Sequence, residues 1–303
     1  MKLSKILRGC LLFFTPIFAQ SQTFTDGILM PKKSICAGVM FTQDAFKDYW
    51  EGTTKRDNLN MGTMTFQGVG VMANYGILDN LNVIAMLPYV TTKASAGVLS
   101  GWSGVQDLTL GLKYNVLKKD NLDVIATVGG SVPVTNYLAA NPLAIGNQSK
   151  TLFGRAIVHY LSQNGLTFTA QGAYILRGNI KIDATNYYTD RNINSNEVAM
   201  GDQFNASIRA GYYTFRSAFE GVFEQTTTLD GFDIRRNDMP FPSNKMEATR
   251  VGVMAHYRIE KLKDLQVVAN VFYTLNGRNV GQALSTNLGL FMAFDFKKKE
   301  ISK

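Results

Sequence analysis

Residues 286–296 read TNLGLFMAFDF, and apolar side chains alternate with small or polar ones along most of this stretch. One face carries Leu288, Leu290, Met292, Phe294 and Phe296, and the other carries Asn287, Gly289, Ala293 and Asp295. Successive side chains of a β-strand point to opposite faces. The same alternation recurs along the chain in segments of about ten residues, which is typical of a barrel with lipid on its outside. The pattern predicts an all-β fold, a transmembrane antiparallel up-and-down β-barrel.

Short and long connections alternate between the predicted strands. Short turns are expected at 78–80, 118–121, 163–165, 214–216 and 261–264, several of them with Asn, Asp or Gly. Long polar loops are expected at 42–62, 93–104, 134–151, 178–201, 226–246 and 275–283. The strands between them are 33–41, 63–77, 81–92, 105–117, 122–133, 152–162, 166–177, 202–213, 216–225, 247–258, 265–274 and 284–296. This arrangement predicts about twelve strands, with short periplasmic turns and long extracellular loops.

The beginning of the chain has the features of a secretory signal. Lys2, Lys5 and Arg8 precede an apolar run that is too short to span a bilayer, and small residues follow it. We expect residues 1–21 to be removed, 22–32 to form a periplasmic N-terminal segment that could also fold into the barrel, 33–296 to form the barrel, and 297–303 to be a basic tail. Cys36 then remains as a single cysteine, which excludes an internal disulfide.

Charge and hydropathy exclude two other classes of protein. The formal net charge of +8 falls to +5 without the signal, and the remaining charges are scattered through turns and loops, so we expect no nucleic-acid partner. The mean hydropathy of −0.04 does not fit a helical membrane protein. It fits a barrel whose strands have one polar face.

Inward-facing side chains carry the candidate chemistry. The lumen-lining candidates are Lys113, Arg155, His159, Arg177, Arg209, Glu220, Glu224, Arg250, His256 and Arg258. Arg209 and Glu220 are equidistant from a turn at 214–215 and are expected to be direct cross-strand neighbours, a pair that Glu224 and Arg250 could extend into a ladder. Such a ladder could hold strands together, which is the commoner case, or select solutes, or do both.

Aromatic residues are expected at the membrane boundary near the short turns. Tyr75, Tyr114, Tyr160, Tyr257 and Phe296 fall on the outward face near strand ends. We predict that they form the periplasmic girdle, where an aromatic ring lies in apolar material with any polar tip in water.

The sequence gives little support to catalysis. Both histidines, His159 and His256, fall on the interior face, whereas a barrel phospholipase needs serine and histidine on the lipid side. The predicted loops contain no histidine for a protease-like site. We therefore predict no enzyme, no metal site and no cofactor.

Three segments resemble a known family. YGILDNLNVIAMLPYV at 75–90, SGWSGVQDLTLGLKYNVL at 100–117 and SVPV at 131–134 are similar to the outer-membrane barrels of the MetA-pathway-of-phenol-degradation family. That family places Leu-Pro-Tyr at a strand end and Gly-x-x-Asp before a strand ending in Lys-Tyr, here Gly104, Asp107, Lys113 and Tyr114. The resemblance implies an outer-membrane channel or transporter, linked to small hydrophobic or aromatic compounds.

Two functions of different classes follow. The first is a passive or facilitated small-molecule channel in the cell outer membrane, in contact with outer-membrane lipid and inserted by the barrel-assembly machinery. The alternative is a structural or adhesive barrel whose loops at 178–201 and 226–246 bind a partner, because they contain Tyr187, Tyr188, Phe232 and Phe241. The sequence assigns neither the solute nor the oligomeric state.

Overall fold

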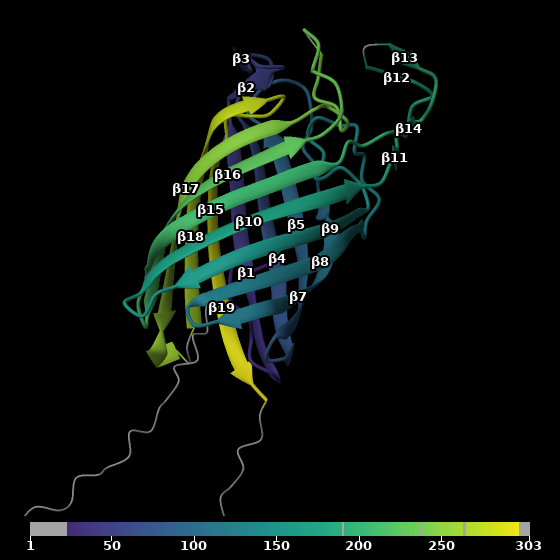
Figure 1. Cartoon of the computed structure of the whole chain (residues 1–303). Coiled ribbons are helices and arrows are strands. Elements are labelled where there is room, and N and C mark those ends of the chain that lie inside the picture. The colour runs from purple at the N-terminus through teal and green to yellow at the C-terminus, as the bar shows by residue number, and fades with distance from the viewer. Residues whose placement is uncertain (1–22, 190, 237, 263–264, 297–303) are drawn as a thin grey trace, which may run out of the picture.

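The computed structural model describes residues 23–189, 191–236, 238–262 and 265–296. The expected signal and the basic tail lie outside these ranges. Twelve long strands form one closed barrel, in which short turns gather at one end and long loops at the other (Figure 1). They are β1 (Ser34–Phe46), β4 (Met64–Leu78), β5 (Leu81–Ala94), β7 (Asp107–Lys119), β8 (Leu122–Pro133), β9 (Thr151–Leu161), β10 (Leu166–Arg177), β15 (Gln203–Tyr213), β16 (Ser217–Thr228), β17 (Glu247–Ile259), β18 (Leu265–Arg278) and β19 (Leu284–Asp295). The predicted fold and strand count are confirmed, with boundaries within about five residues of the prediction.

Closure joins the first long strand to the last. β1 pairs antiparallel with β19 from Ser34↔Asp295 to Ala45↔Leu284, and its other edge pairs with β4. A barrel without free edges is required in a bilayer because unpaired backbone groups in hydrocarbon cost several kcal/mol each. Every other long strand pairs with its neighbour in sequence, so the topology is up-and-down.

The long loops contain short strands that the sequence did not predict. β2 (Asp48–Glu51) pairs with β3 (Thr54–Asp57), β11 (Ile180–Lys181) with β14 (Glu197–Val198), and β12 (Tyr187–Tyr188) with β13 (Asn192–Ile193). β6 (Ser103–Val105) comes just before β7 in the sequence and pairs with β5. Gln106, which lies between β6 and β7, donates its backbone N–H to the Pro88 carbonyl of β5. The 3₁₀ turn η1 (Glu260–Leu262) lies at the short-turn end, and none of the helices described here is long and apolar enough to cross a membrane.

Two faces of the wall differ as the alternation requires. Outward side chains such as Val71, Leu110 and Phe223 are exposed, although they are large and apolar. On a transmembrane barrel this surface meets lipid. The five predicted girdle residues all lie outward near the short-turn end, four of them exposed and Tyr75 half-buried. A second group of outward aromatics, Tyr89, Tyr174 and Tyr273, lies nearer the loop end and was not predicted.

Candidate functional site: the lumen and its two ends

The segment 23–32 lies inside the barrel near the short-turn end, which is the inward placement that the sequence left open. Its polar half faces Lys113 on β7. The Lys113 ammonium lies 2.7 Å from Asp26 Oδ1 and donates to the carbonyls of Thr23 at 3.0 Å and Ile28 at 2.8 Å. Three acceptors on one segment therefore satisfy a lysine that is fully buried. Arg209, on β15, donates to the Thr25 carbonyl.

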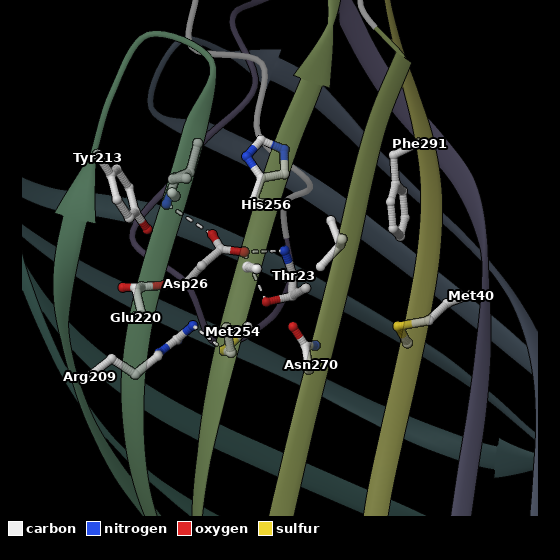
Figure 2. Close-up of a pocket in the computed structure, with 14 residues that line it drawn as sticks. Thr23, Asp26, Met40, Arg209, Tyr213, Glu220, Met254, His256, Asn270 and Phe291 are labelled. Carbon is white, nitrogen blue, oxygen red and sulfur yellow. Dashed lines mark hydrogen bonds between the residues drawn. The ribbon is translucent and has the colours of Figure 1, made fainter.

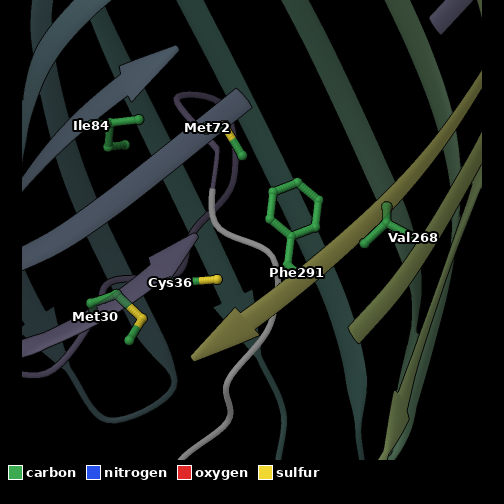
Figure 3. Close-up of a cluster of buried hydrophobic side chains, with 6 residues drawn as sticks. All are labelled: Met30, Cys36, Met72, Ile84, Val268 and Phe291. Atoms are coloured by element: carbon green, nitrogen blue, oxygen red, sulfur yellow. The ribbon is translucent and has the colours of Figure 1, made fainter. Parts of the chain in front are cut away.

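The other half of this segment packs as an apolar plug. Met30 is 1 % exposed and belongs to a buried cluster with Cys36, Met72, Ile84, Val268 and Phe291 (Figure 3). Phe24 meets Phe153 edge to face at 5.6 Å between ring centroids. Gly76 lets the segment approach the wall, because a Cβ there would lie 2.1 Å from the Pro31 carbonyl oxygen. We call residues 23–32 the plug segment.

A small cavity lined by both charged and apolar side chains remains beside the plug segment (Figure 2). Its volume is about 60 Å³, and Asp26, Arg209, Glu220, His256 and Asn270 are among its lining residues. Glu220 Oε1, His256 Nδ1 and Asn270 Oδ1 have no hydrogen-bond partner among the described residues. A cavity of this volume has room for a few water molecules, since one needs about 10–15 Å³, and buried polar atoms normally have such partners.

A second set of charges lies further toward the long loops. Glu224 and Arg250 are cross-strand partners on β16 and β17, with 2.6 Å between Oε2 and Nη2, and the Arg250 guanidinium lies over the Phe272 ring. Arg155 donates to Gln171, whose amide in turn donates to Asn205 and Ser207. This network of polar groups crosses β9, β10 and β15, and Ser207 at its end is the cross-strand partner of Glu224.

The predicted direct pairing of Arg209 with Glu220 is wrong. Arg209 faces Val222 and Glu220 faces Gly211, so the two charged residues are diagonal neighbours. The reason is the turn: the Thr214 hydroxyl accepts the N–H groups of Arg216 and Ser217. The tip of the turn therefore lies at Phe215 and Arg216 instead of the predicted 214–215. The pairing of β15 with β16 is shifted by two residues from the predicted register, and a shift of two leaves the same side chains facing inward.

The remaining candidates lie at different depths. His159 is buried against the plug segment, where Gly27 approaches its ring, and its Nδ1 is 2.8 Å from Thr169 Oγ1. Arg177 lies at the loop end of β10, where its backbone N–H donates to Asp202. Arg258 lies at the short-turn end, over the Phe215 ring at 4.8 Å. His256 Nε2 is 3.3 Å from Gln266 Oε1.

The loop end of the barrel holds a larger cavity of about 600 Å³. Phe46 and Phe66, near the loop-side ends of β1 and β4, line it together with Ile234 and Met239 of the 229–246 loop. We call it the entrance cavity. Within the described residues, no three His, Cys, Asp or Glu side chains are grouped to hold a metal ion.

The sequence did not predict which residues bind Lys113 inside the barrel. Thr23, Asp26 and Ile28 belong to an eleven-residue stretch without strand periodicity, so nothing local assigns them to the lumen. Phe291 gave a usable signal: it is the one large apolar residue on the polar face of 286–296, and it packs in the plug cluster.

This architecture defines a transmembrane β-barrel with a charged lumen and an internal N-terminal plug segment. Residues 52–294 match the family described as "Putative MetA-pathway of phenol degradation", and the chain belongs to this family. Among curated proteins, no sequence matches significantly.

Three solved structures superpose on this chain to different degrees, and one of them has a TM-score above 0.5. An outer membrane channel from Pseudomonas putida F1 superposes with a TM-score of 0.71 at 17% identity, covering 88% of this chain and 97% of that one. A FadL homologue from Pseudomonas aeruginosa gives a TM-score of 0.45 at 8% identity, covering 90% and 96%. The NanC porin gives 0.47 at 9% identity, covering 83% and 98%.

Proposed function

We propose that this protein is a channel of the cell outer membrane for small molecules, acting by passive or facilitated diffusion, and that it is not an enzyme. The observation that carries the proposal is the row of charged and polar side chains inside a closed twelve-stranded barrel, between the entrance cavity and the plug segment. A barrel of this size lies between filled eight-stranded barrels and open porins of 16–18 strands. The similar barrel from Pseudomonas putida F1 is an outer membrane channel.

Small hydrophobic or aromatic compounds are the solutes that we propose. The family description refers to phenol degradation, and the entrance cavity has aromatic and methionine side chains in its wall. In this proposal the long loops face outward, and the short turns and the girdle face the periplasm. Outer-membrane lipid and the barrel-assembly machinery are the partners.

Passage requires the plug segment to move. The cavity beside it has a volume of about 60 Å³, well below the roughly 300–1,000 Å³ of sites that hold drug-sized ligands. Lys113 and Met30 are both buried where the segment crosses the lumen. The conducting state is therefore one in which residues 23–32 leave the wall.

Reconstitution tests this function directly. We would measure ion conductance in planar bilayers and solute-driven swelling of liposomes, for the wild-type barrel and for a variant lacking residues 23–32. The expected result is flux of small solutes through the wild type and larger flux through the deletion. A folded barrel that carries neither current nor solute in either form would contradict the proposal.

The same bilayer system tests whether the channel prefers aromatic solutes, through their effect on the ion current. Benzoate and phenol are added to the conducting barrel, with arabinose as a non-aromatic solute of similar size. Aromatic solutes should reduce the ion current at concentrations where arabinose does not, because they occupy the path. Equal effects of all three would contradict the aromatic preference while leaving the channel itself intact.

A further inference from the structure

Two glycines lie side by side on the inner wall beneath the plug segment. Gly111 on β7 and Gly129 on β8 are cross-strand partners, and the same row continues to Ile84 on β5 and Phe153 on β9. Residues directly opposite each other on neighbouring strands share a face of the sheet. The row therefore has a large apolar side chain at each end and bare backbone between them. We call these four residues the ring slot.

The ring of Phe24, from the plug segment, occupies the ring slot. A Cβ atom on Gly111 would lie 2.8 Å from Phe24 Cε1, and a Cβ atom on Gly129 would lie 2.6 Å from Phe153 Cζ. Neither glycine could therefore carry a side chain while the two rings are in place. Phe24 and Phe153 meet with 86° between their planes, an arrangement that aromatic pairs prefer. The slot thus has the shape and the partner that an aromatic ring requires.

The adjacent row of inward residues on the same four strands is polar. We call it the polar row, and its members are Asn82, Lys113, Thr127 and Arg155. Lys113 binds Asp26, which follows Phe24 by two residues in the plug segment. The Thr127 hydroxyl, on a side chain that is 1% exposed, and Arg155 Nε have no hydrogen-bond partner among the described residues. Since buried polar atoms normally have partners, this row can bind more acceptor atoms than the plug segment supplies.

The carboxylates of the inner wall do not serve the polar row. Three of them have partners of their own: Asp107 binds Tyr137, Asp123 binds Asn115 and Glu224 binds Arg250. Glu220, like Glu224, belongs to β16, which is outside the four strands of the two rows. Among the described residues, Asp26 is the carboxylate that pairs with Lys113. When the plug segment leaves, this buried ammonium loses its counter-charge.

Ring slot and polar row together match a ring joined to a carboxylate. We propose that the inner wall beneath the plug segment binds arylalkanoic acids, and that such a solute opens the barrel by displacing Phe24 and Asp26. Successive inward residues of a strand are about 7 Å apart, which suits an aromatic ring, a short carbon chain and a carboxylate. This inference rests on the proposed channel function, and it adds the place where the solute binds and the event that moves the plug segment.

The plug segment is then a competing ligand within the same chain. A ligand whose site is free in only a fraction of the molecules binds with an apparent affinity reduced by that fraction. Removing the competitor must therefore tighten solute binding. Deleting residues 23–32 removes the whole competitor, and Phe24→Ala removes its ring while leaving the contacts of Asp26 in a full-length chain.

Titration calorimetry of the barrel in lipid nanodiscs measures this competition. The probes are 3-phenylpropionate, 3-phenylpropanol and hexanoate, which have the ring and the charge, the ring alone and the charge alone. The barrel lacking residues 23–32 should bind 3-phenylpropionate more tightly than either other probe. The wild type should bind it at least tenfold more weakly than the deletion variant does, and Phe24→Ala should lie between them.

Cys36 reports the displacement itself. Its side chain is 3% exposed in the cluster that contains Met30 of the plug segment. Saturating 3-phenylpropionate should therefore speed its reaction with a thiol reagent in the wild-type barrel. The alcohol at the same concentration should speed it less, because it lacks the charge that replaces Asp26.

Matched variants test the polar row in the barrel that lacks residues 23–32. Thr127→Val should weaken 3-phenylpropionate by about three- to tenfold, because it removes a hydrogen bond to a charged group. Thr167→Val is the control, since the Thr167 hydroxyl is also buried without a described partner but lies on β10, outside both rows. Lys113→Met should abolish the preference for 3-phenylpropionate over 3-phenylpropanol.

The ring slot has a matched pair of glycine variants. Gly111→Ala places a methyl group where the ring lies, so it should weaken both aromatic probes. Gly154→Ala, on β9, should change nothing, because a Cβ atom there has no neighbour within 4 Å.

Binding and transport fail in different ways. Equal affinity of the wild type and the deletion variant for 3-phenylpropionate would overturn the site beneath the plug segment, as would a preference for the carboxylate that survives Lys113→Met. Flux through a reconstituted barrel that binds 3-phenylpropionate in neither form would overturn the site and leave the channel function standing. Tighter binding after removal of the plug segment, in a barrel that transports nothing, would support the site and contradict the proposed function.

Discussion

At the scale of single residues, the lumen is governed by which buried charges have partners. Glu224 and Arg250 pair directly, whereas Glu220 has one carboxylate oxygen without a hydrogen bond among the described residues. Removing one member of an ion pair leaves the charge of the other member uncompensated. This destabilises the folded state, in which that charge is kept away from water. The pair of Glu224 and Arg250 could hold strands together or select ions, and a substitution of Glu224 distinguishes these two roles.

Glu224→Gln should shift ion selectivity toward anions. The substitution keeps the size of the side chain and leaves Arg250 with an uncompensated charge. The reversal potential across a salt gradient, measured in bilayers, reports the change. Asp183→Asn, at an exposed loop residue, is the matched control. An unchanged reversal potential would favour a purely structural ladder.

At the scale of elements, the closing strand has two tasks. β19 pairs with both β1 and β18, and the Phe296 N–H donates to the Lys33 carbonyl just beyond the last strand pair, 2.9 Å away. The outward face of this strand resembles the C-terminal signal by which such barrels are recognised for assembly. We propose that this strand, which completes the sheet, is also the one that the assembly machinery recognises.

Phe296→Ala should reduce the amount of barrel assembled in the membrane. Its ring is an exposed outward aromatic at the end of the strand, so the folded barrel loses little packing when it is removed. Membrane fractions and heat-modifiable migration on gels give the assembled amount. Removing 297–303 is the comparison and should have no effect, and normal insertion of Phe296→Ala would contradict the prediction.

The loop elements at the entrance should resist mild acid. Hydrogen bonds from Arg278 lower the pKa of Asp233 below its ordinary 3.8. A carboxyl whose folded pKa is lowered stabilises the folded state above its unfolded pKa, and loses that effect as pH falls through the folded value. Proteolysis of the 229–246 loop should therefore be equally slow at pH 7 and pH 5.

Asp233→Asn should speed this cleavage at both pH values, because it removes the charge that Arg278 binds. The cleavage rate of the purified barrel by a protease specific for arginine, followed by mass spectrometry, measures it. Asp230→Asn, in the same loop and without an ion pair among the described residues, should cleave as the wild type does. Strong pH dependence between 5 and 7 in the wild type would show that another group controls the loop.

At the scale of the whole molecule, the barrel and the plug segment form one packed unit. The wall provides Lys113 and a buried apolar cluster, and the segment provides Asp26 and Met30. The long loops are similarly packed on one another: Tyr187 and Phe241 stack at 5.5 Å beside a buried cluster containing Ile180 and Val198. Tyr187 and Phe241, which the sequence suggested as parts of a surface that binds a partner, therefore pack against each other within the loops.

Lys113→Met should release the plug segment. Leaving Asp26 as an unpaired buried charge costs about 3–5 kcal/mol, so the undocked population should rise by roughly a hundredfold to a few thousandfold. Cys36, 3% exposed beneath the segment, reports the change through its rate of reaction with a thiol reagent. Conductance should rise together with it.

Lys118→Met is the matched control, at an exposed lysine of the same strand. It should alter neither Cys36 labelling nor conductance. The double variant Asp26→Leu, Lys113→Met replaces both charges with apolar groups and should restore part of the protection. Unchanged Cys36 reactivity in Lys113→Met would show that the apolar cluster alone holds the segment.

Much of this architecture was predictable because the bilayer constrains it at every strand. An outward residue such as Leu110 must be apolar, an inward one such as Thr109 need not be, and this period of two is visible locally. Register was less predictable. A side-chain hydrogen bond from one turn residue, Thr214, moved Arg209 away from Glu220, and no pattern in the strands themselves encodes that contact.

The sequence by itself determined the closed barrel, its twelve strands and the inward face of each, because alternation and loop length are local properties that lipid and backbone hydrogen bonding enforce. Only the tertiary structure decided that residues 23–32 fill the lumen, that Lys113 binds Asp26, and that Phe24 lies against Gly111. These contacts join residues far apart in the chain, and their energy depends on burial and geometry that exist only once the sheet has closed.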